Sequence, residues 1–199
     1  MDPTLAAGIV GATGSIAGAL LGTILGYKMS NSKADVEVYV DNRVWLYYYE
    51  HCFSMFIPIS VINEGSKSFT ITNFDLTLIS PTNQNWKLYW QDFAEENSHK
   101  GEGWSISKTA SPFLVHGKSG AQHYIRLTSF TKTSENFSDV ILSTGQHQII
   151  LNVFDRSNKN FLSKKYYFNV ETEPFEVLAR RRKDIADLDT WWLPVRSEA

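Results

Sequence analysis

The sequence has a single cysteine, Cys52, among its 199 residues. One thiol cannot form an internal disulfide, so the fold does not depend on an oxidising compartment. The formal net charge is only −2, without the basic surplus that is typical of proteins that bind nucleic acid. We therefore expect no nucleic-acid partner, and a fold stabilised by side-chain packing rather than by cross-links.

Motifs for catalysis and for cofactors are also missing. The sequence contains no G-x-S-x-G nucleophile turn and no G-x-x-x-x-G-K-[ST] phosphate loop. None of the five histidines pairs with another at the spacing of metal ligands on a helix. His51 adjoins Cys52, but adjacent strand residues point to opposite faces, so we interpret Cys52 as a buried structural thiol. The expectation is a non-enzymatic protein without a metal or a cofactor.

Charged residues are absent between Asp2 and Lys28. As a helix, the uncharged segment 3–27 would extend roughly 37 Å at about 1.5 Å per residue, more than a bilayer core of about 30 Å. A helix also satisfies its own backbone hydrogen bonds in lipid. The competing interpretation is a secretory signal peptide, but the segment lacks a basic start and a short apolar core. We predict a transmembrane helix over residues 3–27.

Small residues recur at every third or fourth position of this predicted helix. Such spacing places them on one side, where a second helix can approach closely. Each glycine costs a helix about 1 kcal/mol relative to alanine, so regular placement favours a packing role. A monomeric anchor is the alternative. The predicted helix–helix packing residues are Gly11, Gly14, Gly18, Gly22 and Gly26.

The two flanks of the predicted helix differ in charge. Lys28, Lys33 and Arg43 follow it, and no basic side chain precedes it. Positively charged flanks generally remain in the cytoplasm. We therefore expect a single-pass protein of the cell membrane, with residues 28–35 as a polar linker and the following domain in the cytoplasm.

The rest of the chain has the pattern of a mainly β domain. Aromatic residues make up 14% of the sequence, and such side chains favour half-buried strands. Short apolar runs, such as Val36–Val40 and Gln148–Asp155, are separated by turn residues. Segment 91–111 is polar and irregular, and we expect a loop there. The pattern predicts an antiparallel, two-sheet β-sandwich over residues 36–173.

Three phrases in this region resemble bacterial Ig-like domains of the CARDB or fibronectin-III-like kind. Residues 56–66 form an apolar run followed by an N-x-G-S turn. Residues 114–119 are similar to the L-x-P-G-x-S loop of that family, with His116 in place of proline, and residues 145–153 resemble its late G-x-y-x-I-x-V strand. The resemblance implies a binding or spacer domain and transfers no catalytic residue.

The last segment, 174–199, combines apolar residues at helical spacing with a basic cluster. We expect a short amphipathic C-terminal helix. Three interpretations are open: the segment packs on the sandwich, contacts a membrane surface, or docks a protein partner. The residues that would make the membrane or partner contact are Arg180, Arg181, Arg182, Lys183, Trp191 and Trp192.

These patterns together predict a membrane protein whose helix self-associates into a homo-oligomer and whose β-sandwich binds or scaffolds a protein partner. A membrane-perturbing effector is one alternative. An extracytoplasmic adhesion or carbohydrate-binding domain is another, and it requires the reverse orientation. An enzyme with a site built from segment 91–111 and His116 is the remaining class.

Overall fold

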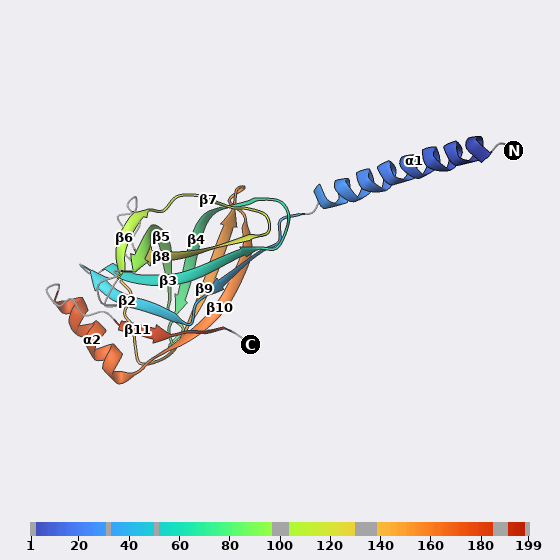
Figure 1. The fold of residues 1–199 in the computed structure, drawn as a ribbon. Helices are drawn as coiled ribbons and strands as arrows, with labels where there is room; N and C mark the ends of the chain where they lie inside the picture. Colours follow the sequence, from blue (N-terminus) through green and yellow to red (C-terminus); the bar gives the residue numbers. More distant parts are fainter. Residues whose placement is uncertain are drawn as a thin grey trace.

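The structure is a computed structural model, and it describes residues 3–30, 33–49, 52–96, 104–129, 139–184 and 191–197. In the first helix, the surroundings of side chains are described for residues 14–27. The helices are α1 (Pro3–Ser30) and α2 (Thr172–Lys183) (Figure 1). The strands are β1 (Val36–Val40), β2 (Arg43–Tyr49), β3 (Cys52–Asn63), β4 (Phe69–Ile79), β5 (Asn85–Glu96), β6 (Trp104–Thr109), β7 (Phe113–Val115), β8 (Ser119–Thr128), β9 (Gly145–Asp155), β10 (Asn160–Val170), β11 (Trp191–Pro194) and β12 (Arg196–Ser197).

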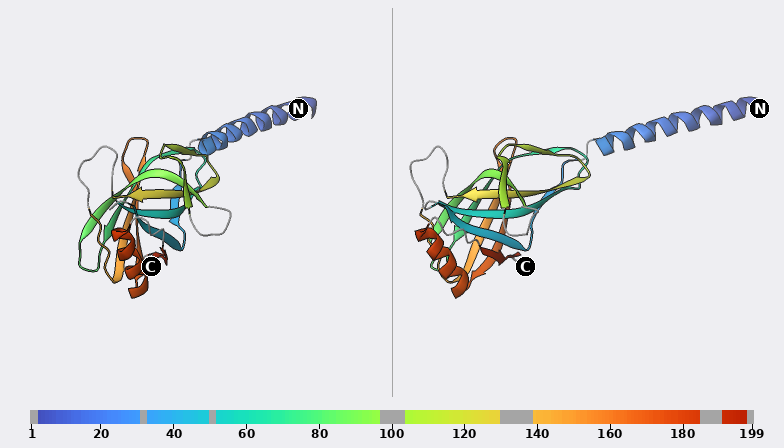
Figure 2. Two further views of the ribbon diagram at one scale, coloured as in Figure 1. Left: turned by 90° about the vertical axis from the view of Figure 1, so that its left-hand side faces the viewer. Right: turned by 60° about the vertical axis from the view of Figure 1, so that its left-hand side comes forward.

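All twelve strands belong to one antiparallel sheet, in the order β11-β2-β3-β8-β5-β4-β9-β10-β12. Strands β1, β6 and β7 are attached to β3, β5 and β4. The order begins and ends with neighbouring segments of the C-terminal stretch, so the sheet bends into a nearly closed barrel (Figure 2). The predicted mainly β, antiparallel class is confirmed. The two separate sheets expected from the sequence are not found in the described chain, because strand pairing is continuous from β2 to β10, and β11 and β12 extend the two outer strands.

The first edge of the sheet shows how a proline is accommodated in a central strand. β1 and β2 both pair with the same side of β3, and a two-residue bulge at Asp41–Asn42 separates them. Pro58 lies opposite this bulge, and its carbonyl accepts a hydrogen bond of 3.0 Å from the Asp41 N–H. Proline has no N–H to donate, so it is tolerated where the strand ladder is interrupted.

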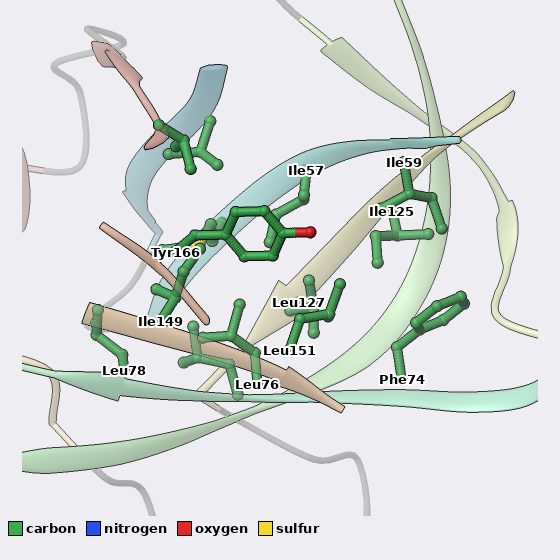
Figure 3. Close-up of a cluster of buried hydrophobic side chains, with 14 of the residues drawn as sticks. Ile57, Ile59, Phe74, Leu76, Leu78, Ile125, Leu127, Ile149, Leu151 and Tyr166 are labelled. Atoms are coloured by element: carbon green, nitrogen blue, oxygen red, sulfur yellow. The ribbon is translucent and has the colours of Figure 1, made fainter. Parts of the chain in front are cut away.

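The inside of the barrel is filled by apolar side chains. Alternate residues of each strand point inward, and Phe74, Ile57 and Leu127 are fully buried there. Tyr166 enters the same core from β10 (Figure 3). Its hydroxyl accepts a 3.3 Å hydrogen bond from the Val40 N–H, which satisfies a polar group that would be costly to bury alone.

Strand β3 is buried on both faces, because a second apolar cluster covers its outer face. Phe56 of β3 packs there with Trp45 of β2 and Trp104 of β6, with ring centroids 5.7 Å and 5.9 Å from Trp104. The loop expected over segment 91–111 is wrong for most of its length. β5 continues to Glu96, and β6 pairs with it, since Phe93, Trp104 and Ile106 alternate with polar residues.

The C-terminal helix predicted from the sequence is confirmed as α2, which packs against β2. Its buried Arg181 is only 5% exposed, and the Nε–H donates a 3.0 Å hydrogen bond to the Tyr48 carbonyl. The Tyr48 hydroxyl in turn donates to the Val140 carbonyl at 2.8 Å. Burial raises the pKa of Tyr48, so this hydroxyl stays protonated and able to donate. The β domain therefore extends beyond the expected boundary at residue 173.

Replacement of Leu193 by alanine tests the closing role of β11. Leu193 is 4% exposed and packs into the barrel core, so Leu193→Ala should lower the free energy of unfolding by about 2–5 kcal/mol. The adjacent Trp192 is 55% exposed, so Trp192→Ala should cost less than about 1 kcal/mol. Urea unfolding followed by tyrosine and tryptophan fluorescence measures both. Equal effects of the two substitutions would contradict this account of the strand.

Candidate functional site

Helix α1 projects away from the β domain (Figures 1 and 2). It makes no substantial contact with any strand or with α2 in the described part of the chain. Its large apolar side chains are therefore uncovered, each between 58% and 61% exposed. These side chains are Ile16, Leu20, Leu21, Ile24 and Leu25.

The predicted packing glycines lie along this uncovered helix. No atom lies within 4 Å of the position that a Cβ would take at Gly14, Gly18, Gly22 or Gly26. Gly11 falls within α1 but outside the residues whose surroundings are described. Within those described residues, no helix is both long and apolar enough to cross a membrane. The transmembrane helix stays a prediction.

The barrel has a seam where β10 faces β1 and β11. In the described residues, β12 alone joins β10 to the other side by backbone pairing, through Tyr166–Ser197 and Tyr167–Arg196. Elsewhere the seam is held by side chains, including an ion pair between Lys164 of β10 and Glu37 of β1.

Two surface clefts flank β12 along this seam. The first has a volume of about 520 Å³ and lies between β10, β11 and the start of α2. The second has a volume of about 560 Å³ and lies between β10, β1 and the bulge at Asn42. Both volumes are in the range of sites for small molecules or for a few residues of a peptide.

The first cleft contains two residues that the sequence singled out, Trp191 and Trp192. Trp191 also packs against the barrel core, whereas the exposed Trp192 presents its ring to solvent. Carboxylate, phenol and guanidinium groups surround the two rings. Sequence reasoning missed these groups, because only the pairing of β11 and β12 brings them to the tryptophans. They belong to Tyr167, Glu171, Glu173 and Arg196.

The basic cluster of α2 is divided between the interior and the surface. Arg181 is buried against Tyr48, and Arg182 forms an ion pair with Asp139. Arg180 and Lys183 are exposed. No residue of the cluster lines the first cleft, which contains the two tryptophans, and the cluster is not a uniform cationic face. Its interpretations as a membrane or partner contact stay predictions.

The described histidines and the thiol lie apart from one another. Among the residues that the structure covers, no three histidine, cysteine, aspartate or glutamate side chains are placed to hold a metal ion. His51 and His99 are outside the described residues. Cys52 is half-buried, with its Sγ 4.0 Å from the Ser129 hydroxyl oxygen. His116, part of the enzyme alternative, is exposed on the loop before β8.

His147 is the most enclosed of the described histidines. Its ring stacks on Phe168 with centroids 5.2 Å apart, and its Nδ1 lies 3.1 Å from the Gly145 carbonyl oxygen. The carbonyl can only accept, so Nδ1 carries the proton. Its Nε2 is buried and has no partner in the described structure. Burial lowers the pKa of His147, and burial together with the charge of Lys108 lowers the pKa of His123.

Comparison with known proteins identifies no family. No family model and no curated protein matches the sequence. A solved structure of YcdA from Bacillus subtilis, described as a lipoprotein, is similar over 75% of this chain, with a TM-score of 0.38 and 11% identity. The match spans only 41% of that protein. A FixG-related protein from Vibrio parahaemolyticus has a TM-score of 0.34 and 12% identity, over 69% of this chain and 96% of that one. These likenesses are too distant to support an argument about function.

Lowered histidine pKa values make folding stability depend on pH. The unfolded chain takes up protons below about pH 6.5, whereas the folded chain keeps both rings neutral to lower pH. Stability is therefore fully present above the unfolded pKa and is lost as the pH falls towards the lowered folded pKa. We expect the urea midpoint to decrease between pH 7.5 and pH 5.5.

His147→Phe retains the stacked ring and removes one of these protons, so the decrease should become smaller. His116→Gln, at the exposed loop, is the matched control and should leave the slope as it is in the wild-type protein. A wild-type midpoint that does not change over this range would contradict the assignment of neutral, buried rings.

Proposed function

We propose that this chain is a non-enzymatic, single-pass membrane protein that self-associates through α1 and presents its β domain to a protein partner. One observation carries the proposal: the row of apolar side chains on α1 that no other part of the described chain covers. Fully burying one leucine or isoleucine side chain is worth about 1.5–3 kcal/mol. Five such residues left in water are therefore a strong reason for another apolar phase to surround this helix.

The helix would also be a poor one in water by itself. Its four described glycines each lower helix stability by about 1 kcal/mol relative to alanine, and most helices in proteins depend on packing. In a bilayer the helix keeps its backbone hydrogen bonds, because no water competes for them. The uncharged segment 3–27 is long enough for this role.

Self-association follows from the shape of the same helix. The open positions at Gly14, Gly18, Gly22 and Gly26 leave a groove along one side. A second copy of α1 fits this groove because small residues permit close van der Waals contact, which lipid chains supply less well. Chain orientation with the β domain in the cytoplasm follows from the basic flank after the helix.

The partner-binding part of the proposal rests on the first cleft. Its Trp192 ring is exposed beside carboxylate and guanidinium groups, and exposed tryptophans are enriched at the centres of interfaces. The resemblance to Ig-like domains agrees with a binding role and adds no residue. A carbohydrate ligand in the same cleft, with the reverse membrane orientation, is the second candidate.

Bulky residues in the glycine groove test self-association. Gly18→Leu and Gly22→Leu together should reduce the yield of cross-linked oligomer in membranes at least about tenfold, because the two backbones can no longer approach. Ala19→Leu is the control, since Ala19 lies on another side of the helix and the change also introduces a leucine side chain. An unchanged yield in the double variant would exclude the groove as the contact.

A single engineered thiol tests membrane insertion and orientation. Ser30→Cys, in a Cys52→Ser background, places the thiol at the end of α1. We expect it to resist an impermeant maleimide in intact cells and to react after the membrane is permeabilised. The chain should also stay in the membrane pellet after an alkaline carbonate wash. Strong labelling in intact cells would favour the reverse orientation, and release by carbonate would contradict insertion.

A further inference from the structure

The residues that follow α1 are fixed to one end of the β domain. The Asp35 carbonyl accepts a 2.8 Å hydrogen bond from the Glu64 N–H, and the Asp35 N–H donates to the Asn63 side chain at 3.2 Å. Gly65 lies so close that an added Cβ would be 2.2 Å from the Lys33 carbonyl oxygen. Ser30, the last residue of α1, is three residues before Lys33. Because consecutive Cα atoms are about 3.8 Å apart, the Cα atoms of Ser30 and Lys33 are at most about 11 Å apart.

Strand register gathers three turns at this same end. Asn63 at the end of β3 is opposite both Val36 and Ser119, so the turn after β3 lies beside the turn before β8. The Lys118 N–H donates to the Gly65 carbonyl at 2.8 Å, which joins these two turns directly. Ile71, near the start of β4, is paired with Asp155, so the β9–β10 turn reaches the same end.

This end of the domain, which we call the basic end, carries five cationic side chains. None of the five forms an ion pair within the described chain, and all five residues are exposed. Three carboxylates accompany them, on Asp35, Glu64 and Asp155, so five positive charges against three negative charges leave a surplus of two. The Oδ1 atom of Asp155 accepts hydrogen bonds from the backbone N–H groups of Ser157 and Lys159 in its own turn. The five cations are Lys33, Lys67, Lys118, Arg156 and Lys159.

The backbone at Lys118 adds to the argument. Its φ is 55°, in the left-handed region where glycine or asparagine is favoured. A lysine at this position gives up some backbone stability. The lysine nevertheless places a free cation at the tip of the turn, beside the attachment point of α1.

We propose that the basic end docks on the anionic headgroups of the membrane that α1 enters. This inference rests on the proposed insertion of α1, which brings Lys33, the first cation of the basic end, within about 11 Å of the helix end. Each lysine or arginine near an anionic leaflet is attracted to it, and the attraction falls off within a Debye length. The α2 cluster lies at the opposite end of the barrel from α1, so it faces away from this bilayer (Figure 1).

The test uses the full-length chain in vesicles of phosphatidylcholine, with or without phosphatidylserine. A fluorophore is attached at Ser157→Cys, in the exposed β9–β10 turn, in a Cys52→Ser background. Energy transfer to an acceptor on lipid headgroups reports docking. The same fluorophore is attached in a second variant at Thr144→Cys, an exposed position before β9 at the opposite end of the barrel. Transfer from this position would show that the side of the barrel, and not the basic end, rests on the membrane. We expect transfer from residue 157 to be stronger in phosphatidylserine vesicles than in phosphatidylcholine vesicles, and to fall to the phosphatidylcholine level at high salt.

Charge reversal identifies the surface. Lys67→Glu with Lys118→Glu should lower the ratio of docked to undocked protein at least about tenfold. Lys183→Glu with Arg196→Glu reverses two exposed cations elsewhere on the domain and should have little effect. Circular dichroism and urea unfolding verify that both double variants are folded. Equal transfer in both lipid compositions, or equal loss in both double variants, would overturn the inference.

Failure of insertion would look different from failure of docking. If carbonate releases the chain from all vesicles, α1 is not inserted, and flotation with phosphatidylserine vesicles then measures docking alone. Binding that the first double variant abolishes would support the basic end. The absence of any binding would overturn it. If the chain resists carbonate but residue 157 shows no lipid-dependent transfer, insertion stands and docking is wrong.

Discussion

The pairing of the C-terminal stretch with two different strands is the constraint on which the rest of the β domain depends. β11 continues the sheet beyond β2, and β12 continues it beyond β10. Without these pairs, two long strands would expose their backbone groups to neighbouring molecules, which is a common route to aggregation. Closure also encloses the core around Tyr166. The seam and its two clefts exist because the closing stretch is short, with Pro194 unable to donate a hydrogen bond towards β10.

Closure of the barrel also determines where α2 lies. The chain must return from the end of β10 to the edge of β2, and α2 makes the first part of this path. Its Arg181 is buried because the helix crosses the Tyr48 carbonyl, where a guanidinium supplies the hydrogen bond that β2 leaves unmade. An arginine cluster in a sequence is usually read as surface charge. Here one member contributes to the core, a second pairs with Asp139, and the remainder stays in solvent.

Local patterns in the sequence were sufficient for most strands and insufficient for their partners. Alternation in Val36–Val40 and Gln148–Asp155 identified β1 and β9 because a half-buried strand imposes that period. Segment 91–111 was misread because its packed aromatic residues, Phe93 and Trp104, are separated by a long polar run. Nothing in Trp191–Ser197 identifies a closing strand, since the segment is short and its pairing joins residues about 150 positions apart in sequence. The cleft beside Trp192 could not be predicted for the same reason.

Residues 33–35 are held tightly against the β domain. Association of two α1 helices would therefore also restrict how the two β domains lie. Associated helices lie with their axes about 8–10 Å apart. A domain of this size has a radius of gyration of roughly 15 Å, so its width is several times that separation. Two β domains, each held within about 11 Å of its helix, must therefore lie against one another or tilt outwards. With a long flexible linker, the placement of the β domains would not depend on how the helices pack. In this chain the linker is so short that the packing of α1 would determine which side of each barrel is left open to a partner.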